Sequence, residues 1–230
     1  MGFGLSFKLN SSIYWQMNKV DDEKLPNVLM ASSSNELLKR YAVGERDFPG
    51  SRLNGANLTR ANLSGADLSR VHLQYAYLAG ANLKGTNLSQ TVLNGIQLVG
   101  ADLREANLSI SNLSEAELCG ADLRDAVLKT ADLRGSDVSN ANLSCANLCG
   151  ADLRYANLVN SNFSYTNFRN AFLATANLNN AYLVGANLSH TDFNGANVEN
   201  ALFGYNEGLS KAVKLDLQLR GAIFIIDSEI

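Results

Sequence analysis

Two residue types on which most enzyme and metal sites depend are scarce in this sequence. The 230 residues include only two histidines and three cysteines. His72 and His190 have no Cys, Asp or Glu partner at catalytic or metal-ligand spacing, and Cys119, Cys145 and Cys149 do not have the spacing of zinc ligands. Solvated histidines and free thiols in a reducing cytoplasm explain both sets. We therefore expect a protein that is not an enzyme and that needs no metal or cofactor.

Long hydrophobic runs are also lacking. No apolar run approaches the roughly 18 residues of a transmembrane helix, and the N-terminus lacks the residue order of a signal peptide. The formal net charge of −3 favours neither nucleic acid nor an anionic membrane, and no glycine-rich phosphate loop is present. These absences predict a cytoplasmic protein without a nucleic-acid or membrane partner, and they leave a protein partner as the main expectation.

What the sequence does contain is a period of five. Every fifth position from Phe48 to Phe203 is Leu, Phe or Val, which makes 32 consecutive centres. Among the 31 centres from 53 to 203, 25 are Leu. The residue two positions earlier is Ala, Ser or Thr except at Val71 and Ile96, and the residue one position earlier is Asn or Asp in 21 repeats. A fixed internal period indicates a repeat architecture.

Neither regular structure can use this period alone. In a helix, successive centres would rotate around the axis, and in an unbroken strand they would alternate between two faces. A short strand of three residues followed by a two-residue corner works, because the small residue and the centre then share the inner face. Four right-angled corners close a square coil of about 20 residues, and stacked coils form four parallel sheets around a filled interior. Because Val71 and Ile96 are larger than the residues usual in their slots, we expect a local bulge or a shifted neighbour at each.

The repeats, such as "ADLREANLSISNLSEAELCG", resemble the A-(D/N)-L-x-x pattern of the pentapeptide-repeat proteins. The resemblance covers residues 48 to 205, and the flanking segments are similar to those of cyanobacterial members. It implies an all-β fold, a right-handed quadrilateral parallel β-helix of about eight coils. Because one fold hosts many functions, the resemblance does not by itself define the role of the chain.

The segments outside the repeat predict short α-helical caps at both ends, which would cover the open sheet edges. We expect a flexible N-terminal segment over residues 1–32 and an N-terminal capping helix over 33–45, where Ser33 and Glu36 form a capping-box pattern and Gly44 ends the helix. The repeat then occupies 46–205. A C-terminal cap over 206–230 should contain a helix from about Ser210 to Leu219 and a closing strand.

The candidate interaction surface consists of outward charged residues. "ADLR" occurs four times, and within each copy Asp and Arg both point outward and can pair. A solvated, salt-bridged face is the simpler interpretation, and a docking stripe for a protein is the functional one. Two further acids, Glu117 and Asp137, lie in the acidic segment 101–139 and belong to the candidate set. The full set is Asp102, Arg104, Glu117, Asp122, Arg124, Asp132, Arg134, Asp137, Asp152 and Arg154.

Two functions remain open. The first is a rigid, non-enzymatic scaffold that presents an Asn/Asp/Arg-rich surface to an unknown protein. The second, implied by some members of the family that the sequence resembles, is a DNA mimic that binds DNA gyrase. A mimic should be acidic along its length, whereas here residues 51–100 carry a net +3, residues 101–139 a net −4 and residues 140–205 a net −1.

Apolar residues reach outward positions mainly near the C-terminal end. Either the tail folds back over them in a monomer, or two rods meet end to end in a homodimer, as other members of the family do. The residues expected to serve as dimer or cap contacts are Tyr182, Leu202, Tyr205, Leu217 and Phe224.

Overall fold

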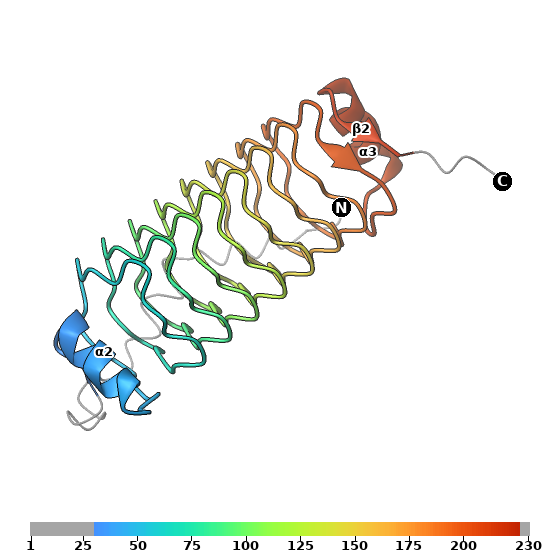
Figure 1. Cartoon of the computed structure of the whole chain (residues 1–230). Coiled ribbons are helices and arrows are strands. Elements are labelled where there is room, and N and C mark those ends of the chain that lie inside the picture. The colour runs from blue at the N-terminus through green and yellow to red at the C-terminus, as the bar shows by residue number, and fades with distance from the viewer. Residues whose placement is uncertain (1–29, 226–230) are drawn as a thin grey trace, which may run out of the picture.

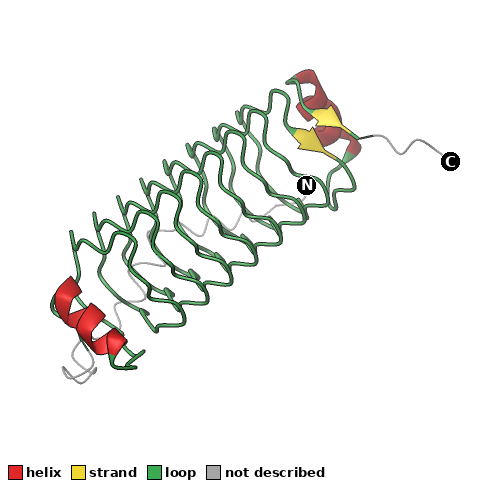
Figure 2. Ribbon diagram, in the orientation of Figure 1, coloured by secondary structure: helices red, strands yellow, loops and turns green. Residues whose placement is uncertain are grey.

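A computed structural model of the chain describes residues 30–225, so the expectations for residues 1–29 lie outside the described residues. The described part is a rod with a helix at each end (Figure 1). Helix α2 spans Ser34–Ala42, strand β1 Leu202–Phe203, helix α3 Lys211–Leu219 and strand β2 Ile223–Phe224. Between α2 and β1 the chain winds in open coils without long strands (Figure 2).

The coils are joined by single-residue parallel bridges at a spacing of 20 residues. The bridges run from Asp47–Asp67 to Asn187–Glu207, and each involves the residue just before a centre. Four consecutive repeats therefore complete one coil, as the sequence period predicts, and the fold is a four-sided parallel β-helix. Each side is so short that only one residue per repeat lies in the ladder, which is why continuous strands appear only at β1 and β2.

Every coil turns at corners that are closed by a hydrogen bond across four residues. The N–H of Ala56, for example, donates to the carbonyl oxygen of Leu53 at 3.0 Å. The third residue of each such turn has a positive φ, 65° at Gly55 and 58° at Arg60, and this holds for every corner from Gly55 to Tyr205. A positive φ at this residue alone is typical of a type II turn. Glycine adopts it freely, whereas the other residue types found there are strained.

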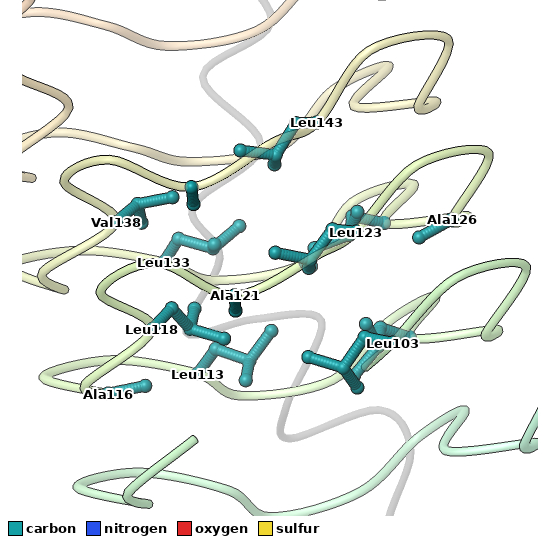
Figure 3. Close-up of a cluster of buried hydrophobic side chains, with 14 of the residues drawn as sticks. Leu103, Leu113, Ala116, Leu118, Ala121, Leu123, Ala126, Leu133, Val138 and Leu143 are labelled. Atoms are coloured by element: carbon teal, nitrogen blue, oxygen red, sulfur yellow. The ribbon is translucent and has the colours of Figure 1, made fainter. Parts of the chain in front are cut away.

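The centres fill the interior. Leu103, Leu113 and Leu123 are 0% exposed, and the Ala residues of the small-residue slots are 0–3% exposed except Ala56 and Ala61, which are partly buried. Figure 3 shows leucines of successive coils pointing inward and lying above one another, with alanines beside them. Where Ser or Thr replaces Ala, its hydroxyl is satisfied within the backbone: Thr86 Oγ1 donates to the Leu83 carbonyl oxygen at 2.6 Å.

The prediction of a local bulge at Val71 and at Ile96 is wrong. Both side chains are buried, at 0% and 1% exposure, and the bridges His72–Val92 and Gln97–Glu117 next to them continue the ladder without interruption. The reason lies in the coils above and below. The neighbouring slots hold Ser51 and Thr91 around Val71, and Ala76 and Ala116 around Ile96. A larger side chain fits because its stacking neighbours are small.

Helix α2 covers the N-terminal end of the rod. Ser33 caps it by accepting a hydrogen bond from the Glu36 backbone N–H at 3.3 Å, while the Glu36 carboxylate accepts from Ser32 rather than closing the expected box with Ser33. Leu37 is fully buried, and Tyr41 donates its hydroxyl hydrogen to the Ser64 carbonyl oxygen at 2.8 Å. The helix therefore closes the first coil with both apolar and polar contacts.

Helix α3 and strand β2 cover the C-terminal end. Ser210 caps α3 through the Val213 N–H, and Leu217 is 0% exposed against the core. Strand β2 pairs in parallel with β1, Leu202 with Ile223 and Phe203 with Phe224. The Phe224 ring stacks on that of Phe203 at a centroid distance of 5.0 Å. No helix among residues 30–225 is long and apolar enough to cross a membrane.

Candidate interaction surface

The outward residues form four columns, one on each side of the rod. Side A holds residues 62, 82, 102, 122, 142, 162, 182 and 202; side B residues 47 to 207; side C residues 52 to 192; and side D residues 57 to 197, each at intervals of 20. Sides A and C face in opposite directions, because they are separated by half a coil. The candidate residues are therefore assigned to a side by their number alone.

Outward Asn and Asp residues have a structural task at each corner. The backbone N–H of the residue two positions after an outward Asn or Asp does not join the ladder. Instead it donates to the Oδ1 of that Asn or Asp: Thr59 N–H donates to Asn57 Oδ1 at 3.1 Å, and Ser69 N–H to Asp67 Oδ1 at 2.9 Å. Such side-chain bonds are typical of Asn and Asp in turns. The abundance of these two residue types is therefore explained by the fold and is not in itself a sign of binding.

In the ADLR repeats the same aspartate also binds the arginine. Asp102 Oδ1 accepts the backbone N–H of Arg104 at 3.2 Å and its Nε–H at 2.8 Å, while Oδ2 accepts Nη2–H at 2.6 Å. The two-pronged pair recurs for Asp122 with Arg124, Asp132 with Arg134 and Asp152 with Arg154. Each of these arginines is held by the aspartate of its own repeat, in the two-pronged geometry of strong charge-assisted pairs.

The pairs also stack along the rod. Arg104 Nε lies 3.7 Å from the Asp122 carboxylate one coil on, and Arg134 Nε lies 3.8 Å from that of Asp152. Hydrogen bonds from Arg104 lower the pKa of Asp102, and those from Arg124 lower the pKa of Asp122. The hydrogen bond to Asp102 correspondingly raises the pKa of Arg104.

The two sets of pairs differ in access. On side A the side chains of Asp102 and Asp122 are 29% and 31% exposed, whereas on side C those of Asp132 and Asp152 are 6% and 8% exposed. Phe172 stands next to Asp152 in the same column. A partner approaching side C would therefore meet arginine and phenylalanine side chains rather than carboxylates.

The remaining two candidates lie on a third side. Glu117 and Asp137 are bridged to each other on side D, and Asn157 Nδ2 donates to Asp137 Oδ1 at 3.1 Å. Neither carboxylate forms an ion pair within residues 30–225. The structure thus divides the candidate set among three sides and does not bring it together in one site.

The candidate contacts at the C-terminal end fall into two groups. Leu217 and Phe224 pack inside the cap, against the core and against Phe203. Tyr182 and Leu202 are bridged on side A, with Tyr182 51% exposed and Tyr205 at the adjoining corner 66% exposed. The tail covers the open end of the rod, and the outward tyrosines stay accessible.

The contacts of two residues at the C-terminal end were not predicted from the sequence. Asn206 occupies a small-residue slot, where its Nδ2 donates to the carbonyl oxygens of Leu183 and Ala186. Arg220, which directly precedes Gly221, donates from Nη1 to the carbonyl oxygens of Phe193 at 3.0 Å and Ala196 at 2.8 Å. The only signal in the sequence was the exception to the Ala, Ser or Thr rule at position 206.

Within residues 30–225, no group of three or more His, Cys, Asp or Glu side chains is arranged to hold a metal ion. Cys119, Cys145 and Cys149 are free thiols.

A family model described as "Pentapeptide repeats" matches residues 45–74, 72–109, 111–144, 141–180 and 173–203. No curated protein matches the sequence. Among solved structures, the chain is similar to HetL, a pentapeptide repeat protein involved in heterocyst differentiation regulation from the cyanobacterium Nostoc sp. strain PCC 7120. The identity is 28%, the alignment covers 75% of this chain and 98% of HetL, and the TM-score is 0.26.

A second similar structure is full-length QnrB1, a plasmid-mediated fluoroquinolone resistance protein, with 19% identity over 77% of this chain and 84% of QnrB1 and a TM-score of 0.49. A third is Rfr23 from the cyanobacterium Cyanothece 51142, with 24% identity over 76% of this chain and 99% of Rfr23 and a TM-score of 0.24.

Proposed function

The chain belongs to the pentapeptide-repeat family, and we propose that it acts as a non-enzymatic rigid scaffold whose β-helix surface binds a protein partner. The observation that carries this proposal is the fixed spacing of the outward side chains. Backbone hydrogen bonds link each coil to the next on all four sides. At the N-terminal end the N–H of Asp67 donates to the carbonyl oxygen of Arg46, and at the C-terminal end the N–H of Glu207 donates to that of Ala186. Repeat proteins use such extended, regularly spaced surfaces for binding.

The interior supports the same proposal. Its positions are filled by leucine, phenylalanine, alanine and other small or apolar residues, nearly all of them buried, and the charged side chains point outward. Outward Asn, Asp and Arg side chains are held by neighbouring groups, which lowers the conformational entropy lost when a partner binds. A rigid surface of this kind suits recognition of a folded or extended protein segment.

A crosslinking scan tests the proposal. A photo-reactive amino acid is placed on one side at a time, at Asn142, Asn147, Asn112 and Asn157, and the protein is exposed to the lysate of the cells that make it. We expect one protein to be captured from one or two sides only, and the purified candidate to bind the unmodified rod. Equal capture of many proteins from all four sides, with no purified candidate binding, would reject the scaffold function.

The alternative is a DNA mimic that binds gyrase. The acidic segment 101–139 favours it, because eight acids there outnumber four bases. Four of those eight acids weaken the mimic hypothesis, because their charge is already neutralised. Asp102, Asp122 and Asp132 are each paired with the arginine of their own repeat, and Glu105 is paired with Lys84 at 3.2 Å. A supercoiling assay separates the two functions, because inhibition of gyrase by micromolar protein would support the mimic.

We also propose that two rods pair end to end through the cap. Strand β2 is bonded to the last coil through the N–H groups of Ile223 and Ile225, so that the N–H of Phe224 between them faces the open end. Ile223 and Ile225 are 49% and 40% exposed, and Leu219 of α3 is 80% exposed. An open apolar edge of this kind is usually covered in soluble proteins.

Sedimentation equilibrium tests the pairing. We expect the wild type to be a dimer at tens of micromolar and the Ile223→Glu variant to be a monomer with an unchanged melting temperature. Val99→Glu is the matched control, because Val99 is 43% exposed at a corner far from the cap. A monomeric wild type would show that the tail serves only as a cap.

A further inference from the structure

The acids of the rod fall into two electrostatic classes. On sides A and C, each ADLR aspartate is neutralised by the arginine of its own repeat. On side D, Glu117 and Asp137 have no cationic partner within residues 30–225, and neither has Glu115 at the corner that leads into this side. No Lys or Arg occupies the column of side D from Asn57 to Asn197, and Arg134 and Arg154 at the corner that leads into it are each paired with the aspartate of their own repeat. Of the four acids without an ion pair in residues 101–139, Glu115, Glu117 and Asp137 therefore lie on or next to side D, and Asp125 lies at the corner between sides A and B.

Exposed tyrosines flank this charge. Tyr75 and Tyr77 precede it along the rod at 62% and 47% exposure, and Tyr155 follows it at 69%. Tyr75, Glu115 and Tyr155 belong to one corner column, because their numbers differ by 40. We call Tyr75, Tyr77, Glu115, Glu117, Asp137 and Tyr155 the acidic–aromatic stripe.

The ring of Tyr75 is held in a defined position. One coil further on, the corner residue is Gly95, and a Cβ there would lie 2.5 Å from ring atoms Cδ1 and Cε1 of Tyr75. The Cδ1–Cε1 edge of the ring therefore lies over the glycine, and a side chain at position 95 would force the ring to move. The tyrosine as a whole stays more than half exposed. An aromatic ring fixed in this way offers a flat platform for a cation.

The spacing of the stripe sets the length of a ligand. Two coil spacings separate Tyr75 from Glu115, and two more separate Glu115 from Tyr155, which gives about 19 Å at 4.8 Å per coil. An extended chain advances about 3.3 Å per residue, so roughly six residues cover the stripe. Glu115 and Glu117 lie at its middle, and the tyrosines lie at its ends.

We propose that the acidic–aromatic stripe binds an extended, arginine-rich segment of the partner protein, an inference that rests on the proposed scaffold function and specifies its surface. Guanidinium groups pair with the carboxylates of Glu115, Glu117 and Asp137, and others stack on the tyrosine rings. Arginine is favoured over lysine because its planar group both forms forked hydrogen bonds and stacks on aromatic faces. An anionic partner is repelled by the three unpaired carboxylates.

The ADLR faces of a second copy of the chain are poor occupants of this surface. The arginines that it could offer from its ADLR repeats are already held by their own aspartates, at 2.6–2.7 Å. Breaking such a fork to form another across an interface gains little. The stripe is therefore independent of the end-to-end pairing proposed for the cap.

The test uses the whole chain and a fluorescent peptide of three arginines alternating with glycine, with a three-lysine peptide of the same design for comparison. Fluorescence anisotropy measures both affinities. We expect the arginine peptide to bind about tenfold more tightly than the lysine peptide, in line with the stacking energy of a guanidinium on a ring. Tyr75→Leu should reduce that preference to less than about threefold while leaving the lysine peptide unaffected.

The carboxylates are tested by Glu117→Gln with Asp137→Asn. We expect this pair to weaken the arginine peptide about tenfold or more at low salt. The matched control is Asp192→Asn with Glu199→Gln, which changes the net charge equally but lies outside the stripe, and it should weaken binding less than about twofold. Equal losses in the two double variants would overturn the inference, because binding would then follow net charge alone.

The outcome also separates this inference from the proposed function. If the crosslinking scan finds a partner that binds through sides A, B or C and is unaffected by the side D variants, the scaffold function stands and the stripe is rejected. If the wild type does not bind the arginine peptide at millimolar concentration, the stripe is rejected whatever the scan finds.

Discussion

Asp102 and Arg104 form a closed unit within a single repeat. The carboxylate of Asp102 accepts two side-chain hydrogen bonds from Arg104, at 2.6 Å and 2.8 Å, and a third from its backbone N–H at 3.2 Å. One side chain thus completes the corner and neutralises a charge. The ADLR sequence therefore stabilises its own corner of the fold. Its arginine is less available to bind a partner protein than an unpaired arginine would be.

The first prediction concerns pH. Hydrogen bonds from the arginines lower the pKa of Asp102 and of Asp122. A carboxylate whose pKa is lower in the folded state contributes stability above its unfolded pKa, about 4, and loses that contribution as the pH falls through the folded pKa. The contribution of the two aspartates should therefore decline progressively as the pH falls below about 4, and no change is expected from it between pH 5 and 8.

The variant Asp102→Asn with Asp122→Asn checks this sign. Asparagine keeps the oxygen that accepts the corner N–H, but it loses the charge and the Oδ2 that accepts Nη2–H of the arginine. Urea denaturation from pH 2 to 7 should show a lower free energy of unfolding for the variant at pH 7 and a smaller difference from the wild type at pH 2. A difference that stays constant over the whole range would contradict the assignment.

The second prediction tests the inward and outward register. Leu118 is 0% exposed in the interior, whereas its neighbour Glu117 is exposed on side D. Leu118→Asp places a carboxylate among stacked leucines and should cost at least several kcal/mol, enough to prevent folding. Glu117→Gln should change stability by less than about 0.5 kcal/mol. Circular dichroism melts of the two variants compare them directly, and equal melting temperatures would mean that the register is wrong.

The sequence predicted the side on which each residue lies, because a period of five with four corners leaves little choice once Leu is assigned to the interior. The sequence pattern could not predict whether a large side chain would fit in a particular small-residue slot. Val71 and Ile96 fit because of the small residues 20 positions away, and that relation is visible only when coils are stacked. The caps posed the same difficulty, since Arg220 reaches carbonyl oxygens of Phe193 and Ala196 that are 27 and 24 residues away.

The candidate surface was predicted less completely. Sequence spacing placed Asp102 and Arg104 close enough to pair, and the structure has that pair. The spacing did not reveal that Glu117 and Asp137 remain without a cation, since that depends on which way each arginine side chain extends. The support that Gly95 gives to the Tyr75 ring was equally hidden, because the two residues are one coil apart.

The third prediction concerns the strained corners. Thr130 has a φ of 53°, in the left-handed region that a β-branched residue rarely adopts. Replacing it with glycine removes this strain, which is about 1–2 kcal/mol, against a smaller gain in the entropy of the unfolded chain. Thr130→Gly should therefore raise the melting temperature. The matched control is Lys129→Gly at the preceding exposed position, which has no positive φ and should lower it. Two changes of the same sign would show that corner strain does not limit stability.

The last prediction concerns the C-terminal cap. Arg220 holds the end of the rod through the carbonyl oxygens of Phe193 and Ala196, and Asp216 orients its guanidinium from the preceding turn of α3. Arg220→Met keeps much of the aliphatic stem but removes the arginine's hydrogen bonds to both carbonyl oxygens, of which that of Phe193 still accepts from the Ala196 N–H at 3.1 Å, and the loss should cost about 1–3 kcal/mol. Because each coil contacts only its neighbours, the loss should stay local.

Hydrogen exchange followed by mass spectrometry measures where that loss occurs. Peptides from residues 190–205 should exchange faster in Arg220→Met, while peptides from residues 100–150 should exchange as in the wild type. Lys211→Met serves as the control, because Lys211 is an exposed cation of the same helix and changes the net charge equally. Faster exchange along the whole rod would mean that the coils unfold as one unit and that Arg220 stabilises all of them. Unchanged exchange at residues 190–205 would mean that the buried face of α3, through Leu217, holds the end without the arginine.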